Sequence, residues 1–174
     1  MANNCWFEIH VKGRHEDCEK WFSLMKGETI DNSFRRIFNV DVTDVTDTDD
    51  ECVMCLCGDC AWSLQSCCRD GYTAIDLFEL YTRELHLVME AYSEEPGIGF
   101  MEHYFYDNGD CIEDECVDYT EWFWDRSCYA TYKEFCESLG YDSIDGEYPN
   151  VPKEDEFDSE GYCYIGGMRW DFSI

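Results

Sequence analysis

Apolar and polar residues alternate in several segments of this chain, and this two-residue period constrains the fold more than any other feature. In the first such segment, residues 5–12, the apolar positions are Cys5, Phe7, Ile9 and Val11. Successive side chains of a β-strand point to opposite faces of its sheet. The pattern therefore predicts a strand with one buried face, followed by a turn at Gly13.

A helical period follows this strand. Residues 15–26 place apolar side chains at steps of three and four, at Cys18, Trp21, Phe22 and Met25. This spacing puts them on one side of a helix, and Gly27 is typical of a helix end. Further strands are predicted at residues 36–42, 51–57, 85–92, 100–106 and 111–119, and further helices at 60–68 and 74–84. Asn108 and Gly109 form a strong hairpin signal between the last two strands.

The order of these segments predicts an α+β fold, with an antiparallel or mixed sheet covered on one face by helices. We place this core at residues 1–119. Residues 120–174 are rich in aromatic side chains and are predicted to form a C-terminal extension packed on the core. Within the extension we expect a helix at 131–139 and a terminal strand pair formed by 162–165 and 169–172.

Acidic residues outnumber basic ones by 40 to 12, which gives a formal net charge of −28. Such a chain lacks the cations that neutralise phosphates, so direct binding to DNA, RNA or an anionic membrane surface is not expected. Apolar residues make up 45% of the chain, far more than in disordered proteins, so the charge decorates a folded body. Basic protein surfaces or metal ions are the expected partners.

The N-terminal residues contain no cationic segment that leads into an apolar one, and no apolar run has the length of a membrane span. We therefore expect a cytoplasmic, reducing location. In that compartment the thirteen cysteines are thiols or metal ligands and not a disulfide framework.

Four of the cysteines form two overlapping C-x-x-C spacings, a pattern that zinc favours. They are Cys52, Cys55, Cys57 and Cys60. If residues 51–57 form a strand, however, Cys52 and Cys55 point to opposite faces and cannot chelate one ion. Cysteine is also a good small core residue. We therefore predict no metal and no cofactor, with metal binding by these four residues left open as the alternative.

The histidines do not indicate an active site. They are His10, His15, His86 and His103. With 40 acidic residues in the chain, a carboxylate near any histidine carries little information about acid–base catalysis. The sequence also lacks a phosphate-binding glycine loop, a nucleophile elbow and a zincin helix. We therefore predict a binding protein and not an enzyme, with no catalytic residues.

The distribution of charge is more informative, because residues 84–125 contain no Lys or Arg. A charge of this size costs stability through self-repulsion, so we expect a basic counter-surface on a partner. The alternative is that these acids form solvated faces that only increase solubility. The predicted acidic partner-binding residues are Asp41, Asp44, Asp47, Asp49, Asp50, Glu51, Glu94, Glu95, Glu113, Asp114 and Glu115.

Three consecutive aromatic residues, Trp122, Phe123 and Trp124, cannot all point inward from one strand or helical turn. We predict Trp122 and Trp124 as aromatic partner-binding residues, since aromatic side chains anchor interfaces while carboxylates steer them. The alternative is that these rings cover the helix-free face of the sheet inside the extension.

Two motifs, Gly58–Ser63 and Ser93–His103, and the opening strand Asn3–Gly13 resemble small uncharacterised proteins of phages and integrative elements related to the YubB group. The resemblance covers Met1–Tyr119. It implies a ferredoxin-like α+β core and a mobile-element origin, and it transfers no catalytic residues. The cysteine-rich strand departs from the pattern of that group.

Some acidic phage proteins of this size inhibit host defence nucleases, anti-CRISPR proteins among them, and this analogy of setting leads to a functional hypothesis. The chain is predicted to bind the basic nucleic-acid-binding surface of a host defence effector, such as Cas9, as a DNA mimic in the bacterial cytoplasm. The alternatives are a zinc-binding or enzymatic accessory protein of a mobile element and a scaffold whose charge serves solubility alone.

Overall fold

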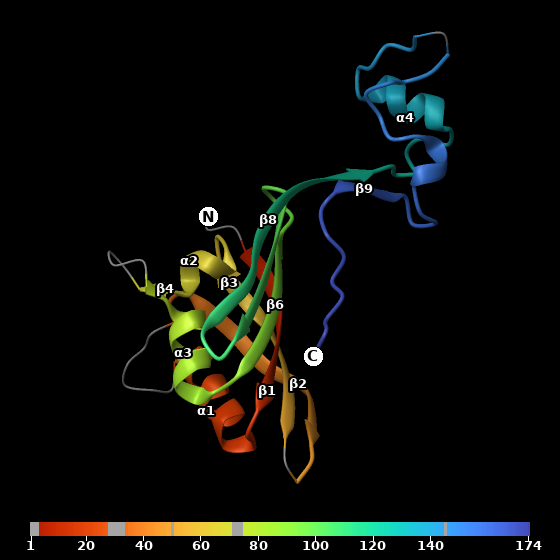
Figure 1. The fold of residues 1–174 in the computed structure, drawn as a ribbon. Coiled ribbons are helices and arrows are strands. Elements are labelled where there is room, and N and C mark those ends of the chain that lie inside the picture. The colour runs from red at the N-terminus through yellow and green to blue at the C-terminus, as the bar shows by residue number, and fades with distance from the viewer. Residues whose placement is uncertain (1–3, 28–33, 50, 71–74, 145) are drawn as a thin grey trace. The chain divides into compact units, whose positions relative to one another are not determined.

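The computed structural model describes residues 4–27, 34–49, 51–70, 75–144 and 146–174 (Figure 1). The chain divides into two compact units. The first comprises Met1–Val117 together with Met168–Ile174, and the second comprises Asp118–Gly167. The last residues of the chain therefore group with the first unit and not with the extension that precedes them.

The strands and helices lie close to the segments that the sequence predicts. The strands are β1 Asn4–Gly13, β2 Ile37–Asp47, β3 Cys52–Ala61, β4 Arg69–Asp70, β5 Ile75–Asp76, β6 Val88–Glu95, β7 Phe100–Asp107, β8 Asp110–Phe123 and β9 Tyr162–Gly166. The helices are α1 His15–Met25, α2 Leu64–Cys67, α3 Leu77–Leu85 and α4 Tyr132–Ser138, with a 3₁₀ turn at Glu154–Glu156.

The fold is α+β, with a seven-stranded antiparallel sheet in the order β2-β3-β1-β6-β7-β8-β9. In the first unit, Figure 1 draws α1 and α3 on one side of the sheet and the C-terminal segment on the other. β4 and β5 form a separate two-stranded ribbon beside α3. The predicted sheet with helices on one face is confirmed at this level of detail.

The main core lies between the sheet and the helices. All four apolar positions of the first strand are fully buried, so the two-residue period reports the inner face of β1 correctly. From the helix side, Trp21 of α1 and Phe78 of α3 stack with their ring centroids 5.8 Å apart. Phe78 also contacts Tyr104 and Tyr106 of β7. Residues far apart in the sequence therefore meet in one aromatic and aliphatic layer.

The predicted hairpin at Asn108 and Gly109 is present, and its backbone explains the residue choice. Both residues have positive φ, 50° and 88°, which a two-residue turn that matches the strand twist requires. A Cβ atom at Gly109 would lie 2.6 Å from Cβ of Arg83. Only glycine therefore fits beside α3 at this position.

Three sequence predictions about elements are wrong. Ile75 and Asp76, expected inside the helix at 74–84, form β5, and α3 begins only at Leu77. Residues 60 and 61 belong to β3, because Cys60 pairs directly with Cys5 of β1, and the helix begins only after Ser63, whose side chain accepts a hydrogen bond from the Ser66 amide. The predicted pairing of residues 162–165 with 169–172 is absent. β9 pairs instead with Tyr119–Phe123 of β8.

The second unit has its own small core, in which aromatic rings predominate. Its buried residues are Trp124, Phe135, Cys136, Val151, Phe157 and Cys163. The helix α4 contributes Phe135 and Cys136 and begins with a capping box between Thr131 and Glu134. This helix confirms the one predicted at residues 131–139.

Candidate functional site

The predicted acidic residues do not form one patch, because most of them lie on two opposite edges of the first unit's sheet. Asp41, Asp44 and Asp47 are on β2, whereas Glu113–Glu115 are on β8. Five strand spacings separate β2 from β8. At about 4.8 Å for each spacing, the two edges are about 24 Å apart.

The β2 edge is exposed and irregular. Its register against β3 shifts twice, between Phe38 and Asp41 and again between Val42 and Asp44. Such bulges and edge charges are common protections against unwanted strand pairing. Two acids at the end of this edge already have cationic or imidazole neighbours. Asp47 lies 2.8 Å from His15, and Glu51 lies 3.1 Å from Lys12. Asp50 lies outside the described residues.

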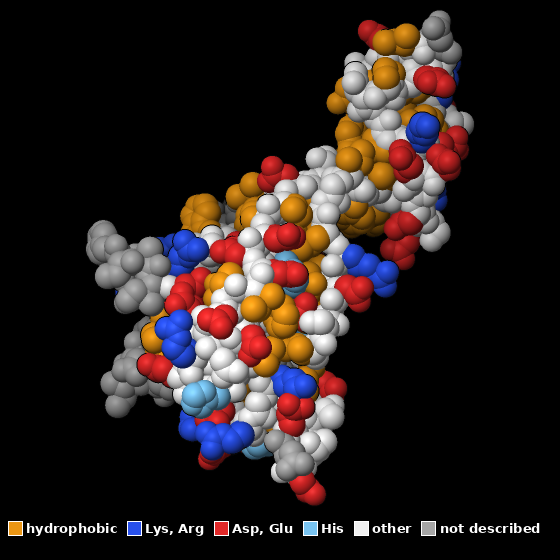
Figure 2. Space-filling model, in the orientation of Figure 1, with side chains coloured by type: hydrophobic (Ala, Val, Ile, Leu, Met, Phe, Trp, Pro, Cys, Tyr) orange, Lys and Arg blue, Asp and Glu red, His pale blue; other side chains and the backbone are white. Residues whose placement is uncertain are grey.

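The β8 edge carries its acids on both faces. Its residues 110–116 are all exposed. β9 pairs only with Tyr119–Phe123, so among the described strands the earlier part of β8 is the outer edge of the first unit. Strand alternation places Asp114 on one face and Glu113 with Glu115 on the other. On the face drawn in Figure 2, carboxylates lie scattered among apolar and uncharged side chains.

Glu95 does not fit the predicted acidic partner-binding set. Its side chain is only 3% exposed and accepts a hydrogen bond from the Ile98 amide, so its carboxylate holds the turn between β6 and β7. The prediction placed Glu95 on the partner-binding surface, whereas its carboxylate is used inside the fold. Glu94, the residue before it, is half-buried.

The aromatic prediction also changes in the structure. Trp124 is 4% exposed, and its Nε1 donates to the Tyr129 carbonyl at 2.8 Å, so it belongs to the core of the second unit. Trp122 is half-buried against the same cluster. Of the three consecutive aromatic residues 122–124, Phe123 is the exposed one, with an exposed fraction of 48%. Trp124 is therefore a core residue and not an exposed anchor.

The four clustered cysteines do not converge on one point. Cys52 and Cys60 are buried on the helix face, whereas Cys55 and Cys57 are half-buried on the opposite face of β3. The strand alternation expected from the sequence therefore holds. Hydrogen bonds with Cys5 and Cys67, together with burial, raise the pKa of the Cys60 thiol. This thiol remains protonated and unreactive at neutral pH.

A polar cluster that the sequence did not reveal lies on the helix-free face of the sheet. His103 Nε2 is 3.0 Å from Oε1 of Glu90, and His103 Nδ1 is 2.9 Å from Oε2 of Glu113. The other oxygen of Glu90 accepts hydrogen bonds from the amide and the hydroxyl of Ser173, at 2.6 and 2.8 Å. Glu90 is thus a buried carboxylate that anchors the end of the chain.

Aromatic rings complete this anchoring. Trp170 stacks on Trp6 with the ring centroids 4.7 Å apart, and Phe172 stacks on His10 at 3.6 Å. The hydroxyl of Tyr92 donates to the Asp171 carbonyl. The C-terminal segment, residues 168–174, therefore covers this face, which is why residues 169–172 are not available to pair with β9. Glu90 and His103 are buried on this face, whereas Glu113 is half-exposed at the β8 edge.

Burial opposes ionisation of Glu90, but the hydrogen bonds from Ser173 and from His103 outweigh it. The pKa of Glu90 consequently lies below its ordinary value of 4.5. The hydrogen bonds from Ser173 that hold the C-terminal segment therefore need the ionised carboxylate of Glu90. A sequence signal for this group would have been an acid at a position within an otherwise apolar strand, since Met89, Ala91 and Tyr92 on either side are also buried.

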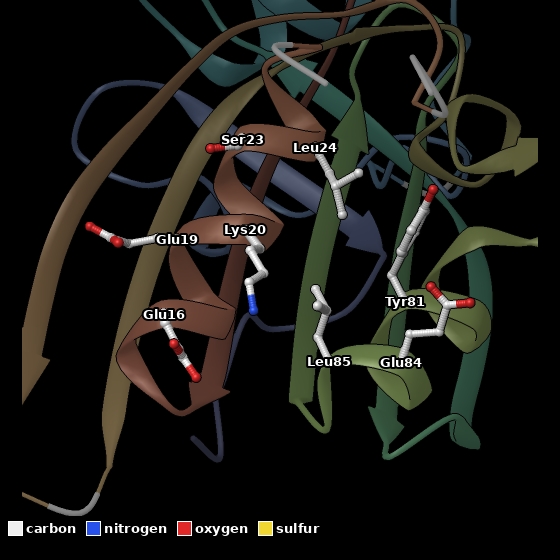
Figure 3. A pocket seen from close by; sticks show the side chains of 8 residues that line it. All are labelled: Glu16, Glu19, Lys20, Ser23, Leu24, Tyr81, Glu84 and Leu85. Carbon is white, nitrogen blue, oxygen red and sulfur yellow. The ribbon is translucent and has the colours of Figure 1, made fainter. Parts of the chain in front are cut away.

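A hollow of about 490 Å³ lies between α1 and α3 (Figure 3). Leu24, Tyr81 and Leu85 supply its apolar surface, and acidic side chains stand at its rim. Its one lining cation, Lys20, is bonded to Asp17 at 2.9 Å. Among the described residues, its lining includes one serine, Ser23, but no histidine or cysteine.

No family model, curated protein or solved structure matches this chain. The resemblance to the YubB group stays a prediction. Within the described residues, no helix combines the length and the apolar character that crossing a bilayer requires.

Proposed function

We propose that this chain is a binding protein that inhibits a host defence nuclease, such as a Cas9-type effector, by occupying its basic nucleic-acid-binding surface. The observation that carries the proposal is the exposed outer edge of β8, which presents carboxylates on both faces within a stretch that contains no Lys or Arg. In this proposal the protein acts in the cytoplasm of a bacterial host cell and has no catalytic residues of its own.

The proposed framework is a ferredoxin-like unit built from β1, α1, β2, β3, α3 and β6. It is supported by the β-α-β-β-α-β order and by the strand order β2-β3-β1-β6 in one sheet. The hairpin of β7 and β8 then extends this unit at one side. The acidic edge of β8 therefore lies outside the six elements of the ferredoxin-like unit. Substitutions on this edge should leave that unit intact.

Electrostatics favours the β8 edge over the β2 edge as the contact surface. Glu113 and Glu115 are exposed on one face of this edge and, as alternate residues of a strand, stand about 6.8 Å apart, while Asp114 is exposed on the opposite face. Each edge has one acid beside a histidine, Glu113 next to His103 and Asp47 next to His15. The end of the β2 edge also has an acid paired with a lysine, Glu51 with Lys12, whereas residues 84–125 contain no Lys or Arg. The net charge of −28 would accelerate association with a basic groove and make that association sensitive to salt.

The test measures binding of the purified chain to a purified Cas9-type nuclease and inhibition of DNA cleavage, at low and at high salt. The double variant Asp114→Lys/Glu115→Lys is expected to weaken binding at least about tenfold, which corresponds to about 1.4 kcal/mol. The matched control is Asp41→Lys/Asp44→Lys, which makes the same change in formal charge on the opposite edge. It is expected to weaken binding less than about threefold, because only the long-range field changes.

Equal losses for both double variants would show that net charge alone drives binding and would rule out the β8 edge. A native chain that neither binds nor inhibits the nuclease at low salt would rule out the proposed target class.

A further inference from the structure

Three side chains with different donor atoms meet where α1 begins beside the turn between β2 and β3. They are His15, the first residue of α1, Asp47, the last residue of β2, and Cys52, the first residue of β3. Their ligand atoms all lie within 4.8 Å of one another, and His15 Nδ1 is 2.8 Å from Oδ2 of Asp47.

The topology of the first unit creates this meeting point. Asp47 and Cys52 are directly paired residues of the β2–β3 hairpin. Cys52 is also paired with Gly13 at the end of β1, two residues before α1 starts. Strand pairing on both sides of Cys52 therefore brings its thiol to the first turn of α1. The three residues come from three different elements and form no local sequence motif.

We propose that His15, Asp47 and Cys52 bind a zinc ion. An imidazole nitrogen, a carboxylate oxygen and a thiolate sulfur are the three donor types that Zn²⁺ prefers in proteins. Binding displaces the thiol proton of Cys52 to solvent, so that Asp47 and the Cys52 thiolate neutralise the two charges of the ion. This set shares only Cys52 with the C-x-x-C cluster that the sequence singles out.

The second ring nitrogen of His15 supports the site. Its Nε2 lies 3.3 Å from Oε1 of Glu19, one helical turn further along α1. A histidine that binds a metal through one nitrogen commonly donates its other N–H to a carboxylate, which fixes the orientation of the ring. Glu19 is therefore the positioning residue of the site.

The surroundings leave access to the site. It borders an open hollow whose lining includes Arg14, Thr48, Asp49 and Glu51. His15 and Asp47 each have 48% of the side chain exposed, whereas Cys52 is fully buried. A fourth ligand position can thus be filled by water from the hollow.

The cations nearest in the chain already have partners. Arg14 is paired with Glu16 at 3.0 Å and with Asp17 at 2.6 Å. Lys12 is paired with Glu51 at 3.1 Å. An incoming Zn²⁺ therefore meets a local excess of negative charge.

Cobalt binding to the full chain tests the proposal. The protein is purified under reducing conditions, stripped with a chelator and titrated with Co²⁺ as the probe. We expect one Co²⁺ per chain, with a thiolate-to-cobalt charge-transfer band in the near ultraviolet and visible bands typical of four-coordinate cobalt. Equimolar Zn²⁺ should then remove these bands, because zinc binds such sites more tightly than cobalt.

Variants identify the ligands. His15→Ala and Cys52→Ser are each expected to weaken Co²⁺ binding at least about 100-fold, and Glu19→Gln about tenfold, in line with the effect of outer hydrogen-bond partners at metal sites. The matched control is Cys55→Ser, which changes a thiol on the opposite face of the same strand and should leave binding unchanged. Because Cys52 is buried, the Cys52→Ser substitution can disturb folding. His15 is half-exposed, so weaker Co²⁺ binding by the His15→Ala variant tests the site without that complication.

Absence of the charge-transfer band at equimolar Co²⁺ would overturn the proposal. A band that survives in the Cys52→Ser variant, or that disappears equally in the Cys55→Ser variant, would also overturn it. So would a Cys18–Cys52 disulfide in protein that binds no cobalt, since the two thiols are neighbours.

Discussion

The two faces of the first unit's sheet are both covered, but by different kinds of interaction. On the helix face, α1 and α3 bury aliphatic and aromatic side chains against β1, β6 and β7. On the other face, the C-terminal segment is held by ring stacking and by hydrogen bonds to one buried carboxylate, Glu90. The packing on the helix face is stabilised by buried apolar area. The attachment of the C-terminal segment depends on the ionised state of Glu90.

This difference implies different responses to substitution and to pH. Loss of apolar contacts on the helix face should destabilise the whole first unit. Loss of the Glu90 hydrogen bonds should release the C-terminal segment before the sheet unfolds. Hydrogen exchange can separate the two events, because segments open with free energies of their own.

The largest effect is expected from Phe78→Ala, which empties the centre of the aromatic layer on the helix face. Phe78 is fully buried against Trp21 and two tyrosines of β7. Removal of a buried phenylalanine costs about 3 to 5 kcal/mol of unfolding free energy. Denaturant unfolding followed by circular dichroism measures the change. As a control, Ile112→Ala, at a position that is 54% exposed, should change stability by less than about 0.5 kcal/mol.

A smaller effect is expected from Glu90→Gln, which keeps the shape of the side chain but removes its charge. The hydrogen bonds from Ser173 and His103 then lose their charged acceptor, at a cost of about 1.5 to 3 kcal/mol. Hydrogen exchange should show faster exchange at residues 168–174 with little change in β1. If β1 and the C-terminal segment lose protection together, the two faces are not independent.

Acidification provides a test of the same contact without a substitution. Because the folded-state pKa of Glu90 lies below 4.5, its contribution is fully present above that pH and is lost as the pH falls through the lower folded value. Protection of residues 168–174 against hydrogen exchange should therefore decrease below about pH 4.5 in the native chain. The Glu90→Gln variant should lack this transition, and an unchanged transition would assign it to another group.

The smallest effect is expected from Trp170→Ala, which removes a half-exposed ring from the covering segment. Its stacking with Trp6 and Tyr92 contributes about 0.5 to 1.5 kcal/mol beyond the buried area. The variant should raise the exposed fraction of Trp6 above its present 41%, and tryptophan fluorescence measures the change. The control Ile98→Ala alters a residue that is already largely exposed, and it should leave both fluorescence and stability unchanged.

Much of the secondary structure could be predicted because its signals are local. The period of β1, the period of α1 and the Asn108-Gly109 turn each depend on neighbouring residues and on backbone sterics. The candidate sites were less predictable. Glu95 was predicted as a surface acid and Glu90 was not singled out, although both are buried, because burial of an acid depends on donors elsewhere in the fold.

The sequence by itself therefore determined most of the strands and helices, the inner face of β1, and a formal net charge of −28. Only the tertiary structure decided that the acids occupy two separate edges, that Trp124 is buried, and that His15 meets Asp47 and Cys52. The physical reason is the range of the interactions. Ser173 reaches Glu90 across 83 residues of chain, and a contact at that separation depends on how the whole sheet is assembled and not on any local pattern.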